Sequence, residues 1–148
     1  MKWLLDTNVV SEPIRPRPDA NVLGWIESQH PGELAISIIT SAELRDGAST
    51  HVDQARRKQL TDWIETTISE QFRDRTLPLT MAILIDWIKL GRHLRSQRIS
   101  REPSDLLIAS TARVHNLVVV TRNVKDFTGT GVMLYDPWAG KTHHMDTP

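Results

Sequence analysis

Short apolar runs alternate along the chain with longer segments in which apolar residues recur at helical spacing. The runs predict strands at residues 2–5, 34–39, 75–79, 118–120 and 132–135. The helical spacing predicts amphipathic helices at residues 20–28, 54–72, 81–94 and 103–115. Pro103 suits a first helical turn, and the apolar composition of residues 103–115 predicts a deeply buried helix. This alternation favours an α/β fold with a mainly parallel central sheet flanked by helices.

The length of the chain suits a single compact domain with one core, since it has 148 residues. We expect that domain to span residues 1–140 and a polar tail to span residues 141–148. His143 and His144 lie in the tail, where we expect them to be unstructured rather than metal ligands.

Composition limits the chemistry that the chain can perform. Its 18 basic and 18 acidic residues give no net charge, so any site for a polyanion must be local. It contains no cysteine, which excludes disulfides and thiolate chemistry and fits a reducing compartment. No apolar run approaches the roughly 18 residues needed to span a bilayer. We therefore expect a cytoplasmic protein without membrane attachment.

Acidic residues follow the predicted strands or open the predicted helices at four places. Asp6 follows the first apolar run in "WLLDTNVVSE", and Asp126 follows a later one in "LVVVTRNVKDF". Glu43 comes shortly after the second strand, and Asp105 lies in the first turn of the buried helix. Because the carboxyl ends of parallel strands meet at one edge of a sheet, we expect these side chains to converge there. Carboxylate ligands favour Mg²⁺ or Mn²⁺ and suit phosphodiester chemistry.

Each of these residues also has a structural interpretation. Glu43 stands three residues after Thr40, as in a capping box, and Asp105 would interact favourably with a helix dipole. Asn8 and Asn123 would serve as helix caps or turn formers, and Asp126 as a turn residue. Four acids at the same predicted edge nevertheless favour one shared site.

Several blocks in this order resemble the PIN-domain ribonucleases. The blocks are "LLDTNVVSE", "ITSAELRDG", "SDLLIASTARVHNLVVVTRNVKDF" and "GTGVMLYDPW". Within these ribonucleases they are similar to VapC, the toxin of VapBC-type toxin–antitoxin pairs, and especially to the FitB-like branch. The resemblance covers residues 1 to about 138.

The resemblance implies a PIN-like fold with an acidic site at the carboxyl ends of the strands. Its catalytic acids would be Asp6, Glu43, Asp105 and Asp126, with Asp6, Asp105 and Asp126 as metal ligands. A polar shell would surround them, formed by Thr7, Asn8, Thr121 and Asn123. Family members can carry the fourth acid where this chain has Asn123, so Asp126 is either its substitute or its neighbour.

The activity implied by the resemblance is that of a toxin endoribonuclease that depends on Mg²⁺ or Mn²⁺. The substrate would be a structured RNA such as tRNA or rRNA, cut by a metal-activated water. The resemblance also implies a homodimer and a cognate VapB-type antitoxin whose C-terminal segment wraps the toxin. Such a segment can place a basic side chain in the acidic pocket.

Arginines provide candidate contacts with an RNA backbone. They lie in a proline-rich loop and around the end of one predicted helix: Arg15, Arg17, Arg92, Arg95 and Arg98, with His93 and Arg101 nearby. The alternative is a solvated surface and a favourable helix end.

Two other functions stay open from the residues alone. A phosphatase of the haloacid dehalogenase type also begins with an aspartate after a strand, but it would want a second aspartate where this chain has Asn8. A non-enzymatic regulatory protein would use the acidic pocket only to receive an arginine from a partner.

Overall fold

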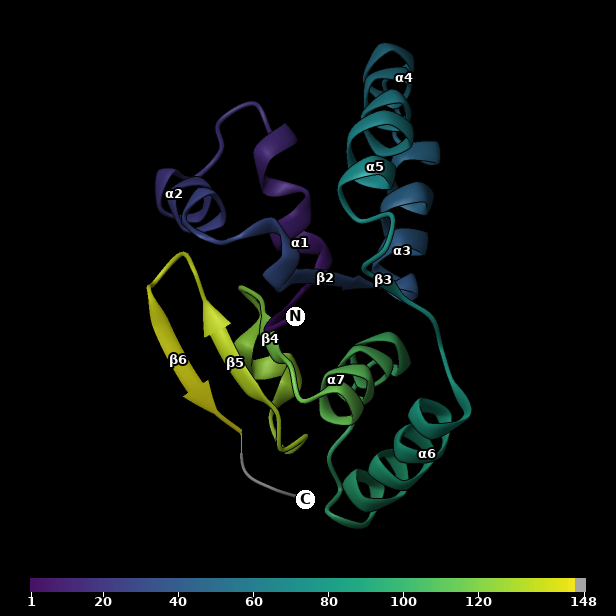
Figure 1. The fold of residues 1–148 in the computed structure, drawn as a ribbon. Helices are drawn as coiled ribbons and strands as arrows, with labels where there is room; N and C mark the ends of the chain where they lie inside the picture. Colours follow the sequence, from purple (N-terminus) through teal and green to yellow (C-terminus); the bar gives the residue numbers. More distant parts are fainter. Residues whose placement is uncertain (146–148) are drawn as a thin grey trace.

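A six-stranded sheet forms the centre of the computed structural model, which describes residues 1–145 (Figure 1). Its strands are β1 (Trp3–Leu5), β2 (Leu34–Ser37), β3 (Thr76–Leu77), β4 (Val118–Val120), β5 (Met133–Asp136) and β6 (Lys141–His144). They lie in the order β3-β2-β1-β4-β5-β6, and every neighbouring pair is parallel except β5 and β6. The predicted mainly parallel α/β sheet is therefore confirmed.

Helices cover both faces of this sheet. They are α1 (Thr7–Val10), α2 (Ala20–Ser28), α3 (Ile38–Ser49), α4 (Gln54–Trp63), α5 (Ser69–Gln71), α6 (Met81–Ser96) and α7 (Pro103–His115). Helices α1 to α5 lie on one face, and α6 and α7 lie on the other (Figure 1). Within residues 1–145, none of the helices is both long and apolar enough to cross a membrane.

Successive strand residues point into two different cores. In β1, Leu4 belongs to the core under α6 and α7, whereas Leu5 belongs to the core under α1 to α5. In β4, Val119 and Val120 divide in the same way. Side chains alternate between the two faces of a strand, and both faces of this sheet are covered. The strands therefore need continuous apolar runs rather than an alternating pattern.

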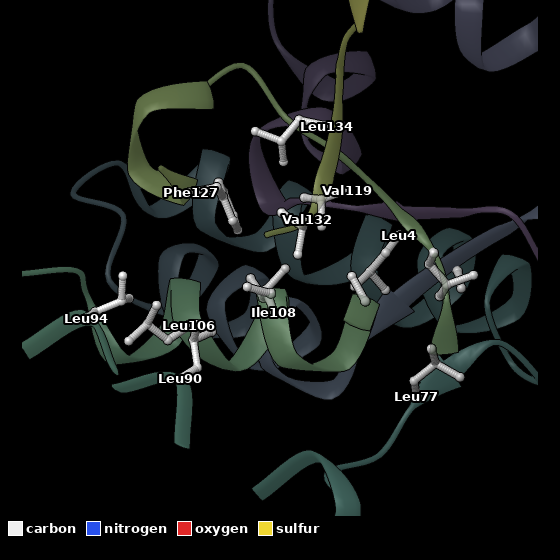
Figure 2. Packing of buried hydrophobic residues seen from close by; sticks show 14 residues of the cluster. Leu4, Leu77, Leu90, Leu94, Leu106, Ile108, Val119, Phe127, Val132 and Leu134 are labelled. Atoms are coloured by element: carbon white, nitrogen blue, oxygen red, sulfur yellow. The ribbon is translucent and has the colours of Figure 1, made fainter. Parts of the chain in front are cut away.

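Helix α7 lies between the sheet and α6. Ile108 is fully buried and points toward Val119 and Val132, while Leu90 and Leu94 of α6 pack on the other side of the helix (Figure 2). The predicted deep burial of α7 is confirmed. The first turn of α7 is thereby held in a fixed position relative to the ends of the strands.

The structure departs from the predicted elements in two places between the strands. The predicted helix at residues 54–72 is interrupted by a π-helical turn, Ile64–Ile68, between α4 and α5. Helix α3 begins at Ile38 with Ser37 as its N-cap, so Thr40 lies inside the helix. Thr40 therefore does not begin a capping box with Glu43, and that interpretation is wrong.

The expectation that His143 and His144 are unstructured is wrong, because Lys141–His144 forms strand β6. His143 and His144 pair with Leu134 and Met133 of β5 in antiparallel register. The turn before β6 is closed by Asp136, whose side chain accepts hydrogen bonds from two amides within residues 137–139. Residues 146–148 of the expected tail lie outside the described residues.

Two glycines should respond oppositely to replacement by alanine. Gly140 in the turn before β6 has φ +66°, whereas Gly24 lies inside α2 with nothing within 4 Å of an added Cβ. Gly140→Ala should lower the free energy of unfolding by about 1–2 kcal/mol, the cost of a left-handed conformation for a residue with a Cβ. Gly24→Ala should raise it by about 0.5–1 kcal/mol. Urea denaturation of both variants measures the signs, and a shift in the same direction contradicts this account of the turn.

Candidate active site

Asp6 leaves the end of β1 with its carboxylate buried and held by three donors. The Thr7 amide donates to Oδ1 at 2.8 Å, as expected for an N-cap of α1. The Thr121 hydroxyl donates to Oδ2 at 2.8 Å, and Asn8 Nδ2 donates to the same oxygen at 3.3 Å. The residue is only 6% exposed. The segment after β1 thus presents an oriented carboxylate at the edge of the sheet.

The Thr121 hydroxyl joins the ends of the neighbouring strands β1 and β4. Its oxygen accepts hydrogen bonds from Asn8 Nδ2 at 3.2 Å and from the Asn123 amide at 3.0 Å. A hydroxyl has one proton and two acceptor lone pairs, so the proton is left for Asp6. Asn8 also accepts from the Arg122 amide at 3.2 Å. Asn8 is therefore a cross-strand link, whereas Asn123 takes part through its backbone.

Glu43 reaches the same edge from the second turn of α3. Its Oε2 accepts a hydrogen bond from the Thr7 hydroxyl at 3.1 Å. Thr7 thus contacts Asp6 through its amide and Glu43 through its side chain. Beside this contact, an apolar hollow of about 160 Å³ runs between α1, α3 and α4, lined in part by Leu44, Leu60 and Trp63.

Asp105 and Asp126 line one polar hollow of about 210 Å³ together with Ser100, Arg101 and Glu102. Asp105 lies in the first turn of α7, and Asp126 lies in the short 3-10 helix Val124–Phe127 after β4. Asp126, and not Asn123, lines this hollow with Asp105.

Electrostatic coupling links the four acids. Burial raises the pKa of Asp6; the hydrogen bonds from Thr121 and Thr7 oppose that rise, and the charge of Asp126 adds to it. Burial and the charge of Asp6 raise the pKa of Glu43, against the hydrogen bond from Thr7. The pKa of Asp105 is raised to about 6, mainly by burial and further by the charges of four nearby carboxylates: Asp6, Asp126, Glu43 and Glu102. The acids are close enough to repel one another.

The acids do not form a closed metal centre. Among residues 1–145, no group of three or more His, Asp or Glu side chains has the arrangement of one. Oxygen donors without nitrogen or sulfur nevertheless match the preference of Mg²⁺ for carboxylates and water.

Comparisons with known proteins identify the family of this chain. The PIN-domain model matches residues 3–130. The chain is 33% identical over 135 residues to the toxin FitB of Neisseria gonorrhoeae, and this match covers 91% of this chain and 97% of FitB. It is 32% identical over 135 residues to the VapC ribonuclease Y4jK of Sinorhizobium fredii, with 91% and 96% covered. The crystal structure of FitAcB from Neisseria gonorrhoeae matches with a TM-score of 0.87 and 32% identity, covering 92% of this chain and 98% of that one.

The chain belongs to the PIN-domain family. Within that family it is a toxin of the VapC and FitB type, a ribonuclease of a toxin–antitoxin system. The predicted family and fold are confirmed. This assignment removes the phosphatase alternative.

The arginines predicted from the sequence are dispersed over the surface of this PIN domain. Arg15 forms an ion pair with Glu12 at 3.5 Å, and Arg17 is exposed in the same loop. Arg92 and Arg98 are exposed near the end of α6, whereas Arg95 lines a hollow between α6 and α7. Arg101, which the sequence did not distinguish from its neighbours, lines the acidic hollow itself. Its place directly before "EPSD" was the available signal.

Asp105→Asn should stabilise the metal-free toxin at alkaline pH. The folded pKa of Asp105, about 6, lies above its ordinary value of 3.8, so the folded state holds the proton more tightly. The stability from this proton is fully present below pH 3.8 and is lost as the pH rises to about 6. Above that pH the ionised carboxylate is a cost that asparagine avoids.

Melting temperatures in EDTA at pH 4 and pH 8 measure this effect. The variant should exceed the wild type at pH 8, and the difference should shrink toward pH 4. Asp74→Asn, at an exposed residue between α5 and β3, is the control for removing one negative charge. A variant that melts with the wild type at both pH values would show that Asp105 is not under repulsion.

Proposed function

We propose that this toxin is a divalent-metal endoribonuclease that cuts RNA phosphodiesters at the site of Asp6, Glu43, Asp105 and Asp126. The observation that carries the proposal is the mutual repulsion of these carboxylates at one edge of a parallel sheet. A fold that keeps several acids together in spite of their repulsion favours a cationic ligand there.

Mg²⁺, or alternatively Mn²⁺, suits this set of oxygen donors. Asp6, Asp105 and Asp126 would hold it, and Asp126 rather than Asn123 would supply the fourth acid, because Asp126 lines the hollow with Asp105. When bound, the ion supplies positive charge to the phosphoryl oxygens and lowers the pKa of a coordinated water.

The side chains around the acids keep the carboxylates in place. Thr121 and Asn8 both donate hydrogen bonds to Oδ2 of Asp6 and so fix the orientation of its carboxylate. Thr7 couples the orientation of Glu43 to that of Asp6. Fixed carboxylates avoid the cost of reorganisation when the substrate binds. In this proposal Glu43 orients water at the side of the site that adjoins α3.

The partners follow from the resemblance to VapBC pairs. The substrate would be a structured RNA such as tRNA or rRNA, and the toxin would form a homodimer. A cognate VapB-type antitoxin would bind it, with a basic side chain entering the acidic hollow. A similar structure, that of a toxin–antitoxin complex from Klebsiella pneumoniae, supports this partner. The acids described above would attract such a side chain.

Cleavage by a metal-activated water should leave 5′-phosphate and 3′-hydroxyl ends. Antitoxin-free toxin is incubated with total RNA in Mg²⁺ or in EDTA, and the new ends are mapped. Asp6→Asn should reduce the rate by at least the ~10–100-fold typical of losing an outer-shell partner. Asp46→Asn, at an exposed residue of α3, should leave the rate unchanged. Undiminished formation of 2′,3′-cyclic phosphate ends in EDTA would reject the mechanism.

Mg²⁺ should stabilise the folded toxin without any substrate, because it binds only the assembled site. The melting temperature of the wild type should rise on replacing EDTA with millimolar Mg²⁺. Asp105→Asn and Asp126→Asn should lose most of that rise, whereas Asp74→Asn should keep it. An equal rise in all four proteins would place the ion elsewhere.

A further inference from the structure

Arg101 lies on the wall between two hollows. On one side is the polar hollow that contains Asp105 and Asp126. On the other side is a hollow of about 220 Å³ between α6 and α7, lined by Trp87, Ile88, Gly91, Arg95, Pro103 and Leu106 together with Arg101. Because Arg101 lines both hollows, the two hollows adjoin at this residue. A molecule that occupied both would pass beside Arg101.

The Arg101 side chain is held by main-chain oxygens. Its Nε donates to the Thr128 carbonyl at 3.3 Å, and its Nη1 donates to the Ser100 carbonyl at 2.9 Å. Within residues 1–145, the ion pairs join other residues, so neither Arg95 nor Arg101 is neutralised by a carboxylate. A guanidinium has five N–H donors, so Arg101 retains donors for a phosphate.

The support for Arg101 is rigid. Thr128 precedes Gly129, which has φ +86° and packs so closely on α6 that an added Cβ would lie 2.9 Å from Leu94 Cδ2. The carbonyl that orients Arg101 therefore belongs to a segment fixed against the core. Side chains held in this way suit the positioning of a substrate group.

The second hollow has the chemistry of a base-binding site. The half-buried indole of Trp87 and the apolar side chains of Ile88 and Leu106 provide flat apolar walls, and Arg95 and Arg101 add two cations. Proteins recognise unstacked RNA bases by stacking them on aromatic rings and guanidinium planes. At about 220 Å³, the hollow is smaller than the ≈300–1,000 Å³ of pockets for drug-sized ligands, which suits one planar base.

We propose that Arg101 centres a nucleotide subsite, in which its guanidinium binds the phosphate at the cut and the hollow beside Trp87 receives the adjoining base. The inference rests on the proposed ribonuclease activity and adds to it a phosphate contact at Arg101 and a hollow that selects the neighbouring base. A competing occupant is a second copy of the chain, since Ile85 and Ile88 are exposed on the same helix. The base is favoured because the hollow adjoins the acids and carries two arginines without carboxylate partners.

The phosphate contact is tested on a random-sequence RNA library with Mg²⁺. Arg101→Gln should lower kcat/KM by roughly ten- to hundred-fold, as expected for lost hydrogen bonds to a charged group. Arg101→Lys keeps the charge but loses the planar arrangement of donors, so its kcat/KM should lie between those of the wild type and Arg101→Gln. Lys89→Gln, which removes an exposed cation of α6 that lines neither hollow, should match the wild type. The Mg²⁺-dependent rise in melting temperature should be the same in all of these proteins.

The base contact is tested with Ile88→Trp, which fills the hollow from an exposed position, and Ile85→Trp, its matched control on the same helix. Ile88→Trp should change the preferred nucleotide next to the cut, whereas Ile85→Trp should keep the preference of the wild type. Molar mass by light scattering is measured for both. A changed mass in both variants with unchanged preference makes this face a subunit interface and overturns the base subsite.

Two failures are distinguishable. If the wild type cuts RNA and Arg101→Gln cuts it as fast as Lys89→Gln, the subsite is wrong and the ribonuclease site stands. If the wild type and Asp6→Asn are equally inactive on the library, both proposals are overturned.

Discussion

The buried carboxylate of Asp6 is the constraint on which the rest of the site depends. Backbone pairing between β1 and β4 continues one residue beyond the strands, since the Asp6 amide donates to the Val120 carbonyl at 2.9 Å. That pairing brings Thr121 beside Asp6, where its only proton is directed to the carboxylate. Thr7 then extends the arrangement to Glu43, and the charge of Asp6 contributes to the raised pKa of Asp105. Register between two strands thus orients Asp6 and, through Thr7, Glu43.

Much of the fold was predictable because both faces of the parallel strands are buried. A strand such as β4 must be apolar throughout, and the sequence therefore predicted the strand at residues 118–120 with the correct bounds. Strand β6 was not, since Lys141–His144 is a polar edge strand whose stability comes from pairing with β5 and from the turn at Asp136. Helix α3 was misjudged at its start because Ser37, three residues before Thr40, caps it. Which of two nearby residues caps a helix is decided by where the preceding strand ends.

The acids of the site were predictable, but the contacts between them were not. Asp6 follows an apolar run directly, Asp126 follows another closely, and Asp105 follows a proline suited to begin a helix. The hydrogen bond from Asn8 to Thr121 joins residues 113 positions apart, and nothing local to either residue specifies it. Arg101 differs from Arg92 and Arg98 only through its place beside the hollow, which depends on how α6 and α7 pack. The sequence indicated which residues belong to the site, whereas their hydrogen-bond partners followed only from the tertiary structure.

The repulsion among the acids connects stability to the proposed function. Helix α7 carries Asp105 on a segment that cannot retreat, because Ile108 and Ala109 one turn later are fully buried between the sheet and α6. The core therefore holds the Asp105 carboxylate near Asp6, although burial and the charge of Asp6 disfavour the ionised form of Asp105. Any cation that enters the hollow relieves this cost, whether it is a metal ion or a basic side chain of a bound protein. In the proposed toxin, binding of the metal ion and binding of the antitoxin would then both be favoured by relief of the same repulsion among the acids. One of these cations would exclude the other.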